Sequence, residues 1–110
     1  MDMENTTLTH NTAISSFADC FDMNTEALRC ARVTLGGFRS GVLKSTTSAS
    51  EGAPVWLCGV NVSEPIRIAT YYAVVTASFD DDEADEPTCH VVSFHADKDL
   101  ALDSFRKAAL

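Results

Sequence analysis

The residues most able to do chemistry form an acidic run in the second half of the chain. Six carboxylates fall within seven positions: Asp80, Asp81, Asp82, Glu83, Asp85 and Glu86. The chain has 110 residues and a formal net charge of −8, and without these six charges its net charge would be −2. Negative charge gathered in one segment attracts basic protein surfaces and steers their approach. The run therefore predicts a site for a basic partner.

Two other interpretations of the acidic run stay open. A charged connection between strands keeps a sheet edge soluble without binding anything. Carboxylate oxygens also suit calcium, but the run lacks the glycine and the distal glutamate of an EF-hand loop. We expect either a solvating loop or a contact for a basic partner. One form of such a partner is a nucleic-acid-handling protein, in whose groove the carboxylates would take the places of phosphates.

Cysteine and histidine suggest a metal site, but their spacing argues against one. The cysteines are Cys20, Cys30, Cys58 and Cys89, and no two of them form a C-x-x-C pair. Adjacent residues of a strand point to opposite faces, which separates Cys89 from His90, and Cys89 and His95 would lie roughly 20 Å apart. Only a cross-strand set such as Cys58 with Cys89 or His90 could meet. We predict free, mostly buried thiols, no metal and no cofactor.

Motifs for catalysis are missing from the sequence. The chain has no G-x-S-x-G elbow and no phosphate-binding glycine loop, and Gly36-Gly37 is typical of a helix end. A chain this short rarely encloses an active-site cleft unless two subunits share one. The sequence therefore predicts a non-catalytic protein. The alternative is a small-ligand or metal-binding domain, or an enzyme, with its site at a dimer interface.

A second alternative is a nucleic-acid binder resembling a helix-turn-helix. Residues 14–35 could form two helices around a turn at 22–24, and the second helix would offer Arg29 and Arg32 to a groove. However, the turn has no glycine, Glu26 lies in the reading helix, and Lys and Arg total only eight. An acidic chain lacks the basic footprint that nucleic acids and anionic membranes require, so we expect no direct binding to either.

Helical spacing is clear between residues 11 and 35. Ile14, Phe21, Leu28 and Leu35 recur every seven residues. One long helix is possible, but the polar residues at 22–25 favour a break with Asn24 as the N-cap of the second helix. In either case Gly36 should end the helix in a left-handed cap.

The rest of the chain alternates strand-like and polar segments. Strands are expected at 38–43, 55–62, 66–79 and 88–95, of which the first is short and the third is long, with loops at 44–54 and 80–87. The last of these strands leads into a helix at 96–110, with Asp97 as its N-cap and Asp103–Lys107 as an i, i+4 pair.

These elements predict an α+β fold. It comprises an N-terminal helix or helical hairpin, an antiparallel β-meander of three to four strands, and a C-terminal helix packed on one face of the sheet. We expect both helices on the same side. Residues 1–10 are polar and form a flexible N-terminus, and residues 11–110 form a single domain.

The expected function is that of a small acidic intracellular protein-interaction module, acting as an inhibitor or adaptor. The acidic run would steer the approach to a basic partner, and Tyr71 and Trp56 would supply an aromatic contact. Small domains with one long strand often complete their core across a two-fold axis, so a homodimer is considered. Because the chain begins without a signal sequence or a bilayer-length apolar stretch, a cytoplasmic location is expected.

Overall fold

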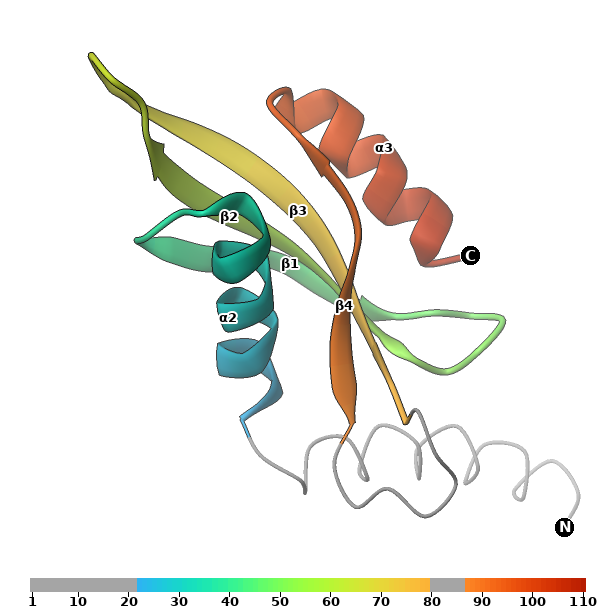
Figure 1. Ribbon diagram of the computed structural model, residues 1–110. Helices are drawn as coiled ribbons and strands as arrows, with labels where there is room; N and C mark the ends of the chain where they lie inside the picture. The colour runs from blue at the N-terminus through green and yellow to red at the C-terminus, as the bar shows by residue number, and fades with distance from the viewer. Residues whose placement is uncertain (1–21, 80–86) are drawn as a thin grey trace, which may run out of the picture.

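The computed structural model describes residues 22–79 and 87–110. Its elements are, in order, α2 (Met23–Leu35), β1 (Ser40–Thr47), β2 (Pro54–Ser63), β3 (Ile68–Ser78), β4 (Thr88–His95) and α3 (Lys98–Ala108). The strands form one antiparallel sheet in the order β1-β2-β3-β4, so each strand pairs with its neighbour in sequence (Figure 1). The predicted α+β fold, with its antiparallel meander and C-terminal helix, is confirmed.

The sheet lies between the two helices, which cover opposite faces. Successive residues of β2 point to alternate sides, so Trp56 and Cys58 pack under α2 while Val55 and Leu57 pack under α3. The expectation that both helices share one side is wrong. The physical reason is that the central strands β2 and β3 carry apolar residues on both faces, and each face needs its own cover.

Helix α2 begins where Asp22 caps it. The Asp22 carboxylate accepts hydrogen bonds from Thr25 N at 3.3 Å and from Thr25 Oγ1 at 2.8 Å, and these bonds lower the pKa of the carboxyl group. A single helix over 11–35 is therefore excluded. Asn24 is not the N-cap, because its Oδ1 instead accepts a 2.7 Å hydrogen bond from Trp56 Nε1.

The end of α2 agrees with the sequence. Gly36 has φ of 69°, the left-handed conformation that glycine adopts without strain, and its N–H donates to the carbonyl of Arg32. The chain then crosses close to β2 at Gly37 before it enters β1.

Strand β1 is longer than expected. The segment 44–47 was predicted as loop because it is polar, yet it pairs with β2 as an edge strand. Backbone ladder bonds do not depend on apolar side chains, and polar residues such as Lys44 are typical of protected edges. The boundaries of β2 and β3 differ from the prediction by a few residues, and those of β4 match it.

Helix α3 follows the prediction closely. Asp97 Oδ1 accepts hydrogen bonds from Asp99 N at 2.7 Å and Leu100 N at 3.3 Å, and Lys107 Nζ lies 3.3 Å from Asp103 Oδ2. At the C-terminus, the carbonyls of Ala109 and Leu110 accept 3.0 Å hydrogen bonds from the backbone N–H groups of residues 49 and 50. These bonds tie the end of the chain to the β1–β2 turn.

The close approach at Gly37 gives a stability test. A Cβ at this position would lie 2.7 Å from the backbone oxygen of Asn61 and would overlap Val60 Cγ1. We expect Gly37→Ala to lower the free energy of unfolding by about 1–3 kcal/mol, measured by urea denaturation. Gly41→Ala is the matched control, because a Cβ there meets no atom within 4 Å. Equal losses in the two variants would contradict this account.

Candidate functional site

Two strongly exposed apolar side chains, Ile66 (94%) and Ile68 (61%), lie where the β2–β3 hairpin outgrows the rest of the sheet. The last rung of β1 is Ser40↔Val60 and the last rung of β4 is Tyr72↔His95. Beyond them, the rungs Val62↔Ala69 and Ser63↔Ile68 have no neighbouring strand. We call residues 62–69 the projecting hairpin, and Figure 1 shows it at the upper left, extending past α2.

A network of hydrogen bonds holds the turn of the projecting hairpin. Glu64 N donates to Arg67 O at 2.8 Å, and the Glu64 carboxylate accepts from Arg67 Nε at 3.1 Å and from Tyr71 Oη at 2.6 Å. The tyrosine bond is the main cause that lowers the pKa of Glu64, and the same bond raises the pKa of Tyr71. Ile66, at the tip, is 94% exposed. The turn therefore presents one aliphatic side chain on an ordered support.

An open hollow of about 300 Å³ lies at the base of this hairpin, on the α2 side. Its lining comes from the end of α2 and from three strands: Thr34, Leu35, Val62, Tyr71 and Phe94. None of these residues carries a formal charge, and Phe94 is 58% exposed. The hollow is suited to an apolar side chain rather than to a charged ligand.

A chain of hydroxyl and imidazole groups joins β4 to α3 on the other face. The oxygens Ser93 Oγ and Ser104 Oγ are 2.5 Å apart, and His95 Nε2 lies 3.1 Å from Ser93 Oγ. A serine beside an imidazole is part of a nucleophile–base pair, but acyl transfer also needs an orienting acid and oxyanion donors. Among the described residues, no carboxylate is bonded to His95. We interpret this chain as a polar link between β4 and α3.

Three thiols lie between α2 and the sheet. Cys30 Sγ, on α2, donates to the carbonyl of Cys89 at 3.4 Å, and Cys58 is buried on β2. Burial raises the pKa of Cys58 to about 12 and that of Cys89 to about 11, and it also raises the pKa of Cys30. All three are free, as predicted, and high pKa values make them poor nucleophiles and poor metal ligands.

The described segments contain no group of three or more His, Cys, Asp or Glu residues that could hold a metal ion. Cys58 and Cys89 are separated by β3, which lies between their strands. The metal-binding set that the sequence left possible, Cys58 with Cys89 or His90, therefore does not come from adjacent strands. Cys20 lies outside the described residues.

Of the predicted partner-binding residues, the structure describes Tyr71 and Trp56. The run containing Asp80, Asp81, Asp82, Glu83, Asp85 and Glu86 lies outside the described residues, and it joins the end of β3 at Ser78 to the start of β4 at Thr88. Tyr71 and Ser78 are seven residues apart on β3, roughly 23 Å. Tyr71 therefore belongs to the projecting end, away from the run.

Trp56 is corrected from a contact residue to a core residue. It is 3% exposed and packs in the cluster beneath α2, with its indole N–H bonded to Asn24. Sequence reasoning also missed Ile66. The proline turn signal at 63–65 located the hairpin, but no signal in the sequence showed that β1 and β4 stop short of it.

The helix-turn-helix alternative gains no contact from the structure. Arg29 Nε is bonded to Glu26 Oε2 at 3.0 Å, and the opposite side of α2 packs on the sheet. The first helix of that motif would lie in residues 14–21, outside the described residues.

Comparisons with known proteins add no relative: no family model, no curated protein and no solved structure matches this chain. Neither α2 nor α3, the helices of the described part, is long and apolar enough to cross a membrane.

The buried Cys58 thiol gives a prediction for alkaline stability. Its pKa in the folded chain is about 12, above the ordinary 9.0, so the folded state favours the neutral thiol. The stability this contributes is complete below pH 9 and is lost as the pH rises toward 12. We expect the free energy of unfolding of the native chain, measured in urea, to fall as the pH rises through this window. The fall should be smaller in Cys58→Ala. The same loss in both chains would contradict the assignment.

The Tyr71 hydroxyl gives a second test. In Tyr71→Phe the strongest hydrogen bond to Glu64 is lost, so the pKa of Glu64 should rise toward its ordinary value. The titration of the Glu64 side-chain carboxyl carbon by NMR measures it. Tyr72→Phe is the control, because Tyr72 makes no hydrogen bond to Glu64. An unchanged Glu64 titration in Tyr71→Phe would show that the bond does not hold the turn in solution.

Proposed function

We propose that this chain is a non-catalytic protein-binding module that acts as an inhibitor or adaptor on a basic surface of a partner protein. One observation carries the proposal: the excess negative charge belongs to residues outside the described part of the chain. All eight basic residues are described, against seven acidic ones: Asp22, Glu26, Glu51, Glu64, Asp97, Asp99 and Asp103. The described residues thus sum to +1, and nine carboxylates lie in 1–21 and 80–86.

The position of the acidic run supports binding. The run joins two paired strands: the β3–β4 ladder extends to Ser78↔Thr88, and Pro87, which directly follows the run, is buried. The segment that carries six negative charges in seven residues would therefore be attached to the packed sheet at both of its ends. A basic partner, such as a protein that handles nucleic acid, would meet a concentrated charge beside an almost neutral body.

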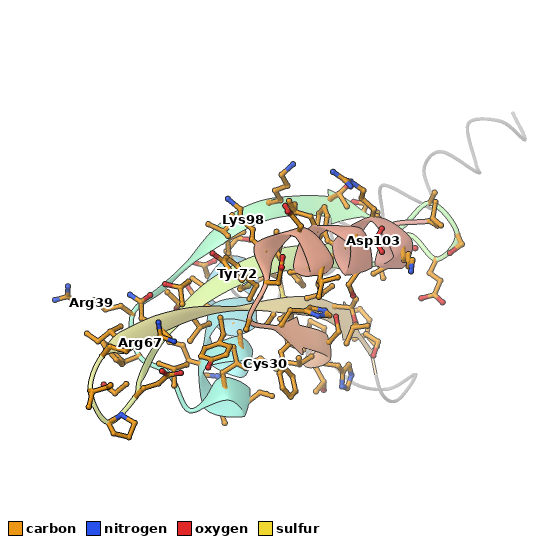
Figure 2. The ribbon with its side chains drawn as sticks, turned by 90° about the horizontal axis from the view of Figure 1, so that it is seen from above. Cys30, Arg39, Arg67, Tyr72, Lys98 and Asp103 are labelled. Atoms are coloured by element: carbon orange, nitrogen blue, oxygen red, sulfur yellow. The ribbon has the colours of Figure 1, made fainter. Side chains whose placement is uncertain are left out.

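Basic side chains lie at both ends of the sheet. Figure 2 shows Arg39 and Arg67 at the end of the projecting hairpin, with the Arg39 side chain directed away from the body. Arg67 is paired with Glu64, whereas Arg39 has no ion-pair partner among the described residues. The acidic run connects the strands at the other end of β3. Arg106 and Lys107, in the last turn of α3, lie toward that same end, because Ala109 and Leu110 are bonded to the β1–β2 turn.

A basic probe tests the proposal directly. The probe is a short fluorescent polylysine, and its binding to the full chain is measured across a salt series. In the variant Asp80→Asn, Asp81→Asn, Asp82→Asn, Glu83→Gln, we expect about tenfold weaker binding and a flatter salt dependence, because the concentrated charge is gone. Circular dichroism should show an unchanged fold.

The matched control removes the same charge elsewhere, through Asp2→Asn, Glu4→Gln, Asp19→Asn and Glu51→Gln. We expect this control to bind the probe nearly as well as the native chain. Equal weakening in both variants would mean that the probe senses only net charge, and the run would then be a solvating loop. Affinity capture from the native cell, compared between the same two variants, extends the test to the natural partner.

A further inference from the structure

We propose that Cys30 and Cys89 form a modification site, at which a peroxide oxidises the two thiols to a disulfide that ties α2 to β4. Neither cysteine belongs to the acidic run, so the proposal is independent of the proposed binding to a basic partner. The disulfide would form under oxidising conditions and would be reversed by a thiol reductant, as is typical of redox-sensing pairs.

The first observation is the contact between Cys30 and the backbone of β4. Cys30 Sγ donates to the carbonyl of Cys89 at 3.4 Å, and the same sulfur is hydrogen-bonded to the backbone of Val91. Two cysteines can be joined when their Cα atoms are roughly 4.4–6.8 Å apart. Because the Cys30 thiol already touches the main chain of Cys89, rotation of the two side chains can bring the sulfurs together without a change in the packing of α2.

The second observation is that the Cys89 side chain lies on the side of the sheet that α2 covers. Cys89 pairs with Ala77, which belongs to the cluster beneath α2, and Cys89 packs against that cluster. Residues directly opposite each other on paired strands point to the same face. Both sulfurs therefore lie in the layer between α2 and the sheet. The thiol of Cys30 also raises the pKa of Cys89 through repulsion between the two negative forms, as expected of neighbouring groups.

The third observation separates this pair from the third described thiol. Cys30 and Cys89 are half-buried, whereas Cys58 is fully buried. A small oxidant reaches a sulfur most readily where the sulfur is partly open to solvent. Strand β3 also lies between the strands that carry Cys58 and Cys89. Cys58 is therefore the poorer partner, and a disulfide between Cys30 and Cys58 is the competing arrangement.

The chemistry takes two steps and consumes one molecule of hydrogen peroxide. The Cys30 thiol loses its proton and its sulfur attacks the peroxide. An S–O bond forms, the O–O bond breaks, and the leaving hydroxide takes up the proton to become water. The Cys89 thiol then loses its proton, and its sulfur attacks the sulfenic acid at Cys30. An S–S bond forms, the S–O bond breaks, and a second water leaves. Two thiols are thus oxidised and the peroxide is reduced.

The rate and the effect of this reaction follow from the structure. Burial raises the pKa of both thiols, so little thiolate is present at neutral pH and the first step is slow. The two cysteines are 59 residues apart, and β1, β2 and β3 lie between them in the chain. Closing so long a loop removes entropy from the unfolded chain, so the oxidised protein should resist urea better than the reduced protein.

Hydrogen peroxide, added to the full chain at about pH 8.5 to increase the thiolate fraction, tests the proposal. Remaining thiols are alkylated, and mass spectrometry of a digest identifies the linked fragments. We expect a fragment containing Cys30 joined to one containing Cys89, and an intact mass lower by two hydrogen atoms. The midpoint of urea unfolding should rise by about 1 M or more, and dithiothreitol should return it to the value of the reduced chain.

Cys30→Ser and Cys89→Ser should each abolish the linked fragment and the rise of the midpoint, while circular dichroism shows that the reduced variants fold. Cys58→Ala and Cys20→Ser are the matched controls, and both should form the disulfide as the native chain does. A native chain that forms no disulfide, or one that joins Cys30 to Cys58 or involves Cys20, would overturn the proposal. Polylysine binding is measured separately, so its failure and the failure of the disulfide are distinct results.

Discussion

The structure depends on the burial of β2 and β3 on both of their faces. Leu57, Val74 and Val75 are fully buried, and they belong to two clusters on opposite sides of the sheet. Because neither face of the central strands can be left to water, one helix must cover each side. The caps at Asp22, Gly36 and Asp97 then set where each helix begins or ends, and hence how much of the sheet it covers.

The helices cover the sheet unevenly. The candidate functional surfaces lie where this cover ends. The central hairpin is longer than either edge strand, so its last two rungs extend beyond the sheet and beyond the end of α2. The apolar hollow forms where the helix ends, and the tip beyond it presents Ile66. Six carboxylates follow β3 at its other end, in the connection to β4. The described residues themselves are nearly neutral, with charges that sum to +1.

Much of the fold could be predicted from the sequence, because alternation and capping are local signals. The boundaries of β4 and the cap at Asp97 rest on residues within a few positions of one another. The failures are non-local. In the sequence Asn24 resembles an N-cap, but its side-chain oxygen accepts a hydrogen bond from Trp56, 32 residues away. Trp56 resembles a surface aromatic until α2 covers it, and the exposure of Ile66 depends on where β1 and β4 stop. Such properties belong to the packed chain and are absent from short patterns.

The meander order has a consequence for how the chain acquires its structure. Every strand pairs with the next one along the sequence, so each ladder closes only a short loop and little chain entropy opposes it. The bonds from residues 49 and 50 to Ala109 and Leu110 are different, since they span about half the chain. During synthesis each strand can pair with the one before it as it emerges, whereas the bonds between the β1–β2 turn and residues 109–110 can form only after α3 has been made.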